Sequence, residues 1–351
     1  MRASYEVTRL GDGAVFAGPG AMRALSEVDS VVFDCDGTLI DVRESYDAAI
    51  LRTVASMTET FLGKSPPIGE VGGRLILEVR RTGGFNSDWD VTYALSLLSA
   101  AVLEEGKTGA ADLQALVEDF GSEERLKGWR SVDEYLASTG LESASLKELR
   151  RYMGYPGTVP SSRLAATFDQ VYYGERLYRR VYGVEPLSSY RTGLIDRERV
   201  IISRGSLDGM RDTLGRGRMA IATGRPFVAV EHTLGGLLEY FERAASVYIG
   251  DGDIFPERAA ELAKFKKPSG ESLVMAGSEL GSRVMLYVGD SAEDRLMVRN
   301  ASGAAGELLF AGIYGSSFDQ EEQISYFTGA GSDLVVKDVN QIAKMLEMAR
   351  A

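Results

Sequence analysis

The sequence predicts an α/β fold with an open parallel sheet, helices on both of its faces, and a second, mainly α-helical domain inserted into it. Short apolar runs at 219–223, 246–250 and 284–290 alternate with stretches of helical character, which is typical of a parallel sheet. Another apolar run ends at Asp34, 189 residues before Thr223. A crossover between parallel strands needs only about a dozen residues, so most of this long interval is expected to be an inserted domain.

The insert differs from the flanking segments in its hydrophobic pattern. We expect residues 1–41 and 201–351 to form the α/β core and residues 42–200 to form the helical domain. Within the insert, apolar residues recur at helical spacing between breaks made by glycine and proline. The predicted helical stretches are 44–62, 68–82, 89–105, 110–120, 144–153 and 162–182.

An N-terminal extension precedes the first core strand. Residues 1–30 contain two short apolar segments around Gly11-Asp12-Gly13, a turn signal that suggests a hairpin. Such a hairpin could add to the sheet, cover its edge or form a contact in a homodimer, and the sequence leaves these alternatives open.

Composition limits the classes of partner. The 351 residues, 44% of them hydrophobic, can bury a large core, and no apolar run approaches the roughly 20 residues that span a bilayer. The net charge of −12 argues against nucleic acid or anionic membrane partners, which favour basic surfaces. The single cysteine, Cys35, excludes an internal disulfide. With no signal-peptide pattern at the N-terminus, these features predict a cytoplasmic protein.

The most informative segment is residues 31–41, an apolar strand followed at once by Asp34, Cys35, Asp36 and Gly37. Side chains two apart leave the same face of a strand, so the carboxylates of Asp34 and Asp36 could meet one metal ion and one substrate. Gly37 permits a sharp change of chain direction after them. Taken alone, the segment is also compatible with a strand that runs into an acidic turn.

Two later segments carry groups that suit a phosphate, and the first of them ends an apolar run. Thr223 and Gly224 offer a hydroxyl and a backbone N–H group before a predicted helix, although Thr223 could simply cap that helix. Lys267 precedes Pro268, and its ammonium group could neutralise an anion. Lys264 and Lys266 lie so close in the sequence that either could take this role, or all three could be surface residues.

A third segment ends in carboxylates. Gly289 and Asp290 follow the strand at 284–288, and Asp294 comes four residues later in a predicted helix. Mg²⁺ prefers oxygen ligands and keeps several waters, so it needs only a few such groups. Acidic residues are also common at helix N-termini without any metal.

In this order the segments resemble the four motifs of the haloacid dehalogenase superfamily of phosphohydrolases. The resemblance implies that Asp34 is the nucleophile that accepts the phosphoryl group, and that Asp36 protonates the leaving oxygen and then activates water. It implies phosphate binding by Thr223, Gly224 and Lys267. The implied Mg²⁺ ligands are Asp34, the backbone carbonyl of Asp36, Asp290 and, directly or as support, Asp294.

The resemblance also implies a Rossmann-like core with a helical cap inserted after the first motif, as in phosphoglycolate phosphatase-like members. The expected activity is Mg²⁺-dependent hydrolysis of a phosphomonoester of a small phosphorylated metabolite. A phosphomutase or phosphotransferase of the same fold is the alternative enzyme, and a non-catalytic binding protein is the alternative from another class. Dehalogenation is disfavoured, because it does not need the acid that Asp36 supplies. The sequence does not identify the substrate.

One loop of the insert is a candidate for substrate specificity. Between two predicted helices, Gly83-Gly84 is followed by aromatic and amide residues. In one interpretation Asn86 and Asp88 contact the substrate's leaving group. In the other the loop only connects two helices, with Ser87 or Asp88 capping the second one.

Overall fold

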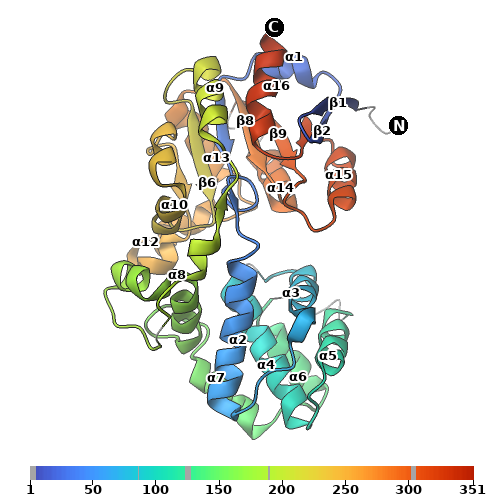
Figure 1. The fold of residues 1–351 in the computed structure, drawn as a ribbon, viewed down its shortest axis with the longest axis vertical. Coiled ribbons are helices and arrows are strands. Elements are labelled where there is room, and N and C mark those ends of the chain that lie inside the picture. Colours follow the sequence, from blue (N-terminus) through green and yellow to red (C-terminus); the bar gives the residue numbers. More distant parts are fainter. Residues whose placement is uncertain (1–4, 86, 123–127, 189, 302–305) are drawn as a thin grey trace. The chain divides into compact units, whose positions relative to one another are not determined.

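The computed structural model describes residues 5–85, 87–122, 128–188, 190–301 and 306–351 (Figure 1). The chain divides into two compact units. The core unit contains Met1–Val42 and Glu198–Ala351, and the helical unit contains Arg43–Arg197. Among the described helices, none combines the length and the apolar character needed to cross a membrane.

The core unit is built on an eight-stranded sheet. Its strands, in the order in which they lie side by side, are β1 (Glu6–Leu10), β2 (Gly13–Ala17), β10 (Leu334–Val336), β9 (Glu307–Ile313), β8 (Val284–Gly289), β3 (Ser30–Phe33), β6 (Met219–Thr223) and β7 (Val247–Tyr248). All neighbours from β10 to β7 are parallel, whereas the β1–β2 and β2–β10 pairs are antiparallel. The predicted α/β class with a mostly parallel sheet is therefore confirmed.

Residues 6–17 form an edge of this sheet. Strands β1 and β2 are a hairpin in which Leu10 pairs with Gly13, and Gly11 adopts a φ of 65°, a value that glycine reaches without strain. The hairpin joins the sheet because Ala17 and Phe16 of β2 pair with Leu334 and Val335 of β10.

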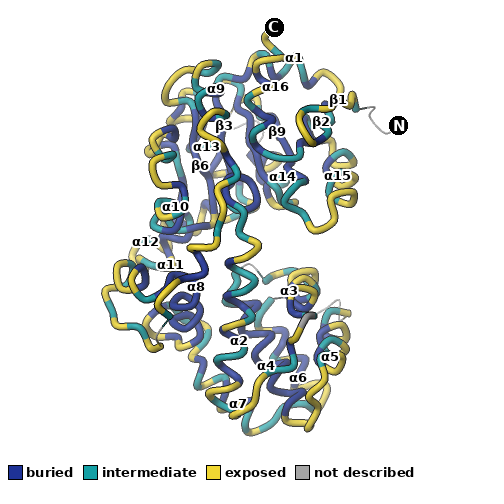
Figure 2. The backbone as a smooth tube through the Cα atoms, in the orientation of Figure 1, coloured by how far each residue is buried: buried dark blue, intermediate teal, exposed yellow. Residues whose placement is uncertain are grey.

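Helices cover both faces of the sheet, as Figure 1 shows. Successive strand residues point to opposite faces, so Val31 and Phe33 pack in one apolar cluster and Val32 in another. The first cluster includes side chains of α9 (Arg204–Leu214) and α16 (Asn340–Arg350), and the second includes those of α13 (Glu271–Leu280) and α14 (Ala292–Ala301). Figure 2 shows the central strands as buried. This double burial explains why their sequences are continuously apolar.

The remaining helices of the core unit are shorter or lie toward its edges. They are α1 (Ala21–Ser26), α10 (Phe227–Leu234), α11 (Asp251–Ile254), α12 (Pro256–Leu262) and α15 (Gln320–Gly329), with 3-10 turns η3 (Gly235–Tyr240) and η4 (Ala263–Phe265). A separate two-stranded ribbon pairs β4 (Ile40–Asp41) with β5 (Arg199–Val200). This ribbon brings together the two chain segments that flank the helical unit in the sequence.

The helical unit contains no strand among its described residues. Its helices are α2 (Tyr46–Leu62), α3 (Gly72–Arg81), α4 (Asp88–Glu104), α5 (Ala110–Ser122), α6 (Ser131–Ser138), α7 (Ala144–Met153) and α8 (Arg163–Tyr182), with 3-10 turns η1 (Gly69–Val71) and η2 (Leu194–Arg197). Helix α4 is buried from Asp90 to Leu103, which makes it the centre of the unit (Figure 2). The sequence did not predict α6, because an eight-residue helix shows barely two turns of apolar periodicity.

Candidate active site

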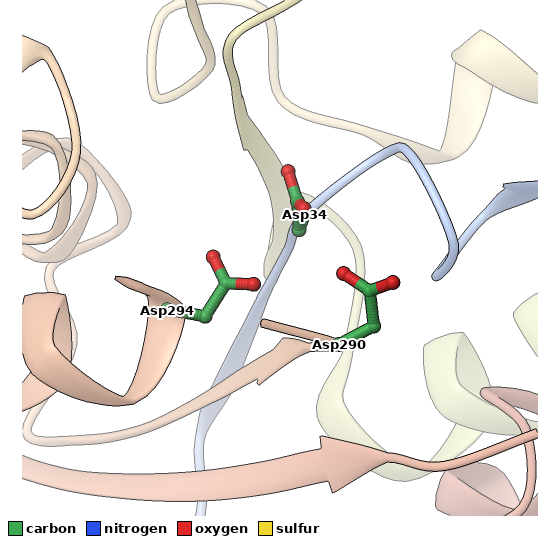
Figure 3. Close-up of side chains that lie close together, drawn as sticks. All are labelled: Asp34, Asp290 and Asp294. Atoms are coloured by element: carbon green, nitrogen blue, oxygen red, sulfur yellow. The ribbon is translucent and has the colours of Figure 1, made fainter. Parts of the chain in front are cut away.

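Three carboxylates from the predicted motifs meet at the carboxyl ends of two adjacent parallel strands (Figure 3). Asp34 follows β3, Asp290 follows β8, and Asp294 lies in the first turn of α14. Each offers one oxygen atom such that the three atoms lie within 4.8 Å of one another. The backbone N–H of Asp34 donates to the carbonyl of Val288 at 2.8 Å, which holds the end of β3 against β8.

Two glycines make this close approach possible. A Cβ at Gly37 would lie 1.9 Å from Oδ2 of Asp290, and Gly37 has a φ of 69° that other residues rarely adopt. A Cβ at Gly289 would lie 2.5 Å from Cγ of Asp294. The space that a side chain would fill at each position is thus occupied by a carboxylate of the site.

Lys267 is the cation of the cluster. Its Nζ lies 2.7 Å from Oδ1 of Asp34 and 2.6 Å from Oδ1 of Asp294. Lys264 and Lys266, the alternatives considered from the sequence, are exposed, and Lys264 lies over the ring of Phe265. The structure therefore brings only Lys267 of these three lysines to the carboxylates.

The carboxylate of Asp294 is held by donors on both of its oxygens. Oδ1 accepts hydrogen bonds from Lys267 and, at 2.8 Å, from the hydroxyl of Tyr287. Oδ2 accepts from the backbone N–H and the hydroxyl of Ser291, at 3.0 and 2.7 Å. These donors fix the orientation of the Asp294 carboxylate, which in turn positions the ammonium group of Lys267. The sequence did not single out Tyr287 or Ser291, because neither belongs to a motif position and only the fold shows their contact with Asp294.

Negative charge exceeds positive charge in this buried cluster. Burial raises the pKa of the Asp34 carboxyl to about 7, against the effect of Lys267, and the charges of Asp294 and Asp36 add to the increase. Burial and the charge of Asp34 also raise the pKa of Asp290 well above its usual value. The pKa of Asp294 is lowered by Lys267 despite burial, and that of Lys267 is raised by Asp294 and Asp34 despite burial.

This donor set fits a divalent cation. The ammonium group of Lys267 pairs with two of the three carboxylates, those of Asp34 and Asp294. The carboxylate groups offer oxygen ligands, which Mg²⁺ prefers. Burial raises the pKa values of Asp34 and Asp290, and neighbouring carboxylates add to the increase, so a bound cation would favour the charged forms of both groups. These three carboxylates could therefore hold a divalent cation, and its identity as Mg²⁺ stays a prediction.

The other motif residues lie at the ends of β3 and β6, which are neighbours in the sheet. Thr223 is buried, and its hydroxyl accepts a hydrogen bond from the backbone N–H of Arg225 at 3.2 Å. Asp36 accepts a hydrogen bond on Oδ1 from Nη1 of Arg225 at 2.9 Å. The intervening Gly224 lies close to Gly250, where a Cβ would be 2.7 Å from the Gly224 carbonyl oxygen.

Arg225 is a site residue that the sequence did not identify. Its side chain is among the largest fully buried ones, and Nη2 donates to Oε2 of Glu198 at 2.8 Å. Its place in the sequence could have indicated a role in the site, because Arg225 directly follows the motif residues Thr223 and Gly224. Glu198 carried no such signal, since it lies at the end of the insert and reaches Arg225 only in the folded core unit.

The residues proposed for specificity lie in the helical unit. Asn86 lies outside the described residues. Asp88 begins α4 and pairs with Arg80 at 2.8 Å, and Ser87 caps the helix by accepting a hydrogen bond from the N–H of Trp89. The capping predicted by the helix-connection interpretation is therefore present, and a substrate role for Asp88 stays a prediction.

A cavity of about 420 Å³ lies elsewhere in the core unit, at the start of β6. Met219, Arg204 and Arg211 are among its lining residues. Ligands of open parallel sheets bind at the carboxyl ends of the strands, and this cavity is at the opposite end of β6 from Thr223. We therefore place the candidate active site at the carboxylate cluster.

The chain belongs to the family of haloacid dehalogenase-like hydrolases, whose family model matches residues 28–302. No curated protein matches the chain.

Solved structures show the same fold at low sequence identity. One, described only as a structural genomics target, is 18% identical, with 91% of this chain and 98% of the other covered and a TM-score of 0.60. Another is a phosphatase from Thermococcus thioreducens that is 24% identical, with 85% of this chain and 99% of the phosphatase covered and a TM-score of 0.52. At these identities the likeness extends to the fold alone.

Proposed function

We propose that the protein is a Mg²⁺-dependent phosphohydrolase that cleaves the phosphomonoester of a small phosphorylated metabolite through an aspartyl-phosphate at Asp34. The observation that carries this proposal is the ion pair between Asp34 and Lys267, held from the other side by Asp294. A buried carboxylate beside a fixed ammonium group suits attack on a phosphorus atom whose oxygens are negatively charged.

Asp34 is the proposed nucleophile. Its carboxylate oxygen forms a bond to phosphorus as the bond to the leaving oxygen breaks, which divides one difficult displacement into two easier ones. Lys267 offsets the repulsion between the anionic nucleophile and the phosphate. The hydroxyl of Thr223, the N–H of Gly224 and the ammonium of Lys267 are the proposed phosphate donors.

Asp36 is the proposed acid and base. It gives a proton to the leaving oxygen in the first step and takes a proton from the attacking water in the second. The water then breaks the bond between phosphorus and Asp34, so the enzyme returns to its starting state.

The proposed Mg²⁺ ligands are Asp34, Asp290 and the backbone carbonyl of Asp36. Because protein donors hold both oxygens of Asp294, we assign it a supporting role beside the metal. When bound, Mg²⁺ supplies positive charge that stabilises the anionic phosphoryl group.

The helical unit is proposed to act as the cap that selects the substrate, with Asn86 and Asp88 as candidates for contact with the leaving group. Caps of this kind exclude water from the reacting centre when they close. Asp88→Asn should then change KM or substrate preference while the unfolding temperature stays nearly constant, and unchanged kinetics across several substrates would remove this assignment.

The direct experiment measures phosphate release from a panel of phosphorylated metabolites with and without Mg²⁺. Asp34→Asn should abolish release, whereas Asp212→Asn, at an exposed position of α9, should not. No release by a folded protein that binds Mg²⁺ would contradict the proposal. In that case a requirement for a bisphosphate activator would indicate a phosphomutase, and its absence a non-catalytic binding protein.

A further inference from the structure

A series of hydrogen-bonded polar side chains connects Thr233 to Asp36. Thr233 on α10 donates from its hydroxyl to Oε2 of Glu198 at 2.7 Å, and Nη2 of Arg225 donates to the same oxygen at 2.8 Å. The other terminal nitrogen of the guanidinium group, Nη1, donates to Oδ1 of Asp36 at 2.9 Å. All four residues belong to the core unit.

The side chains of this series differ sharply in their exposure to solvent. The side chains of Arg225 and Glu198 are 1% and 0% exposed, whereas that of Asp36 is 35% exposed. A buried arginine stays charged and needs anionic partners, and a buried carboxylate needs a cation. Glu198 and Arg225 therefore form an ion pair inside the protein, whereas the carboxylate of Asp36, the second anion paired with Arg225, reaches solvent.

We infer that Arg225 is a positioning residue for Asp36 and that Glu198 and Thr233 orient Arg225. The inference rests on the proposed function, in which Asp36 carries protons to and from the reacting oxygens. A guanidinium group is planar and presents its donors in a fixed fork, so one side held by Glu198 determines where the other side holds Asp36. Arg225 also approaches the proposed phosphate-binding turn, because its N–H donates to Thr223.

The position of Glu198 adds a structural reason for this arrangement. Glu198 directly precedes β5, which pairs with β4 only a few residues after Asp36. The same segment is therefore anchored to the Asp36 loop twice, once by backbone pairing in the ribbon and once through Arg225. Such support around a reacting side chain reduces the number of orientations it can adopt.

A pair of aryl phosphates tests the inference. Phenyl phosphate and p-nitrophenyl phosphate have similar shapes, but phenolate is the more basic leaving group and depends more on an acid that protonates it. A mispositioned acid should therefore lower kcat/KM more for phenyl phosphate than for p-nitrophenyl phosphate. A loss of roughly 10- to 100-fold on phenyl phosphate, with a change below about threefold on p-nitrophenyl phosphate, is expected for Arg225→Lys.

Lysine keeps the charge at position 225 but cannot hold two carboxylates in a planar fork, so this variant separates geometry from charge. Arg204→Lys, at an arginine that pairs with Glu239 elsewhere in the core unit, is the matched control and should leave both rates unchanged. Thr233→Val removes the hydroxyl that donates to Glu198. It should change the ratio of the two rates in the same direction by a smaller factor.

The outcomes separate this inference from the proposed function. If the unmutated protein releases no phosphate from either compound or from the metabolite panel, the proposed function fails. If it releases phosphate and Arg225→Lys lowers both rates equally, Arg225 is merely structural and the inference is overturned. Should Arg225→Lys not fold, Thr233→Val decides, and an unchanged ratio in that variant overturns the inference.

Discussion

Nζ of Lys267 lies 2.7 Å from Oδ1 of Asp34, although 232 positions of sequence numbering lie between them in the chain. The ammonium proposed to bind the phosphate and the carboxylate proposed to attack it are thus already an ion pair. The same ammonium contacts Asp294, so removing it would leave two buried carboxylates without their shared cation. Substitution of Lys267 should therefore affect both activity and stability.

Lys267→Met should abolish most activity and destabilise the protein. Breaking a buried ion pair by removing one partner costs about 3–5 kcal/mol of the free energy of unfolding. Loss of a preorganised charge at the reacting group should lower kcat/KM by roughly 100-fold or more. Lys266→Met is the matched control, because Lys266 is the exposed neighbour in the sequence, and it should change neither quantity appreciably. Equal effects of the two substitutions on kcat/KM would contradict the role of Lys267.

Gly37→Ala should weaken metal binding. The added Cβ would meet Oδ2 of Asp290 at 1.9 Å, so the carboxylate must move, and the φ of 69° adds strain of about 1–2 kcal/mol. Gly20→Ala is the control, because Gly20 has a φ of 78° but a Cβ there meets no atom within 4 Å. Both variants should lose stability through the positive φ, but only Gly37→Ala should raise the Mg²⁺ concentration needed for half-maximal phosphate release. An unchanged Mg²⁺ requirement would argue against Asp290 as a ligand.

The stability of the metal-free protein should fall as pH rises from about 4 to about 7. The pKa of Asp34 is raised to about 7 and that of Asp290 is also raised, whereas an unfolded carboxyl titrates near pH 4. The folded state therefore binds more protons in this window, and the free energy of unfolding decreases with pH. The lowered pKa of Asp294 changes the free energy of unfolding only below about pH 4. The raised pKa of Lys267 changes it only above about pH 10.

Urea unfolding at several pH values, in EDTA and in Mg²⁺, measures this effect. Mg²⁺ competes with protons for the carboxylates, so its stabilisation should be larger near pH 8 than near pH 5.5. Other acidic groups also contribute to the pH dependence, and Asp34→Asn isolates the contribution of Asp34 by making the EDTA profile flatter. A profile in EDTA that is equally steep in the two proteins would show that Asp34 does not titrate in this way.

Tyr287→Phe should cost stability with little loss of activity. The hydroxyl of Tyr287 donates to Oδ1 of Asp294 at 2.8 Å, and a hydrogen bond to a charged group contributes about 1.5–3 kcal/mol. Lys267 and Ser291 still hold Asp294 in this variant, so kcat/KM should fall less than about tenfold. Thermal unfolding and phosphate release, compared with Tyr326→Phe at a partly exposed position of α15, check both expectations. A loss of activity as large as that of Lys267→Met would show that Tyr287 has a more direct role.

Local patterns explain how much of the site was predictable. Asp34, Asp36, Asp290 and Thr223 each follow an apolar run, and the carboxyl ends of adjacent parallel strands meet at one edge of a sheet. The helices of the insert could likewise be predicted wherever apolar residues keep helical spacing over several turns. The short helix α6 was missed because so few residues carry its pattern.

Contacts between distant residues were not predictable in this way. The pairing of Arg225 with Glu198 and Asp36, and the donors around Asp294, depend on which side chains the folded core unit brings within about 3 Å. The resemblance already implied Lys267, but residue type alone did not distinguish it from its two neighbours, and its contact with Asp34 is seen only in the structure.

The sequence by itself determined the α/β class of the protein, the order of its motif segments and the residue types available for phosphate and metal chemistry. It could do so because hydrophobic periodicity and turn chemistry act between residues that are close in the chain. Only the tertiary structure decided that the ammonium of Lys267 pairs with both Asp34 and Asp294, that Asp294 is held by four donors, and that Arg225 holds Asp36. Those outcomes depend on burial, because a charge removed from water must find its partners among whatever groups the fold places beside it.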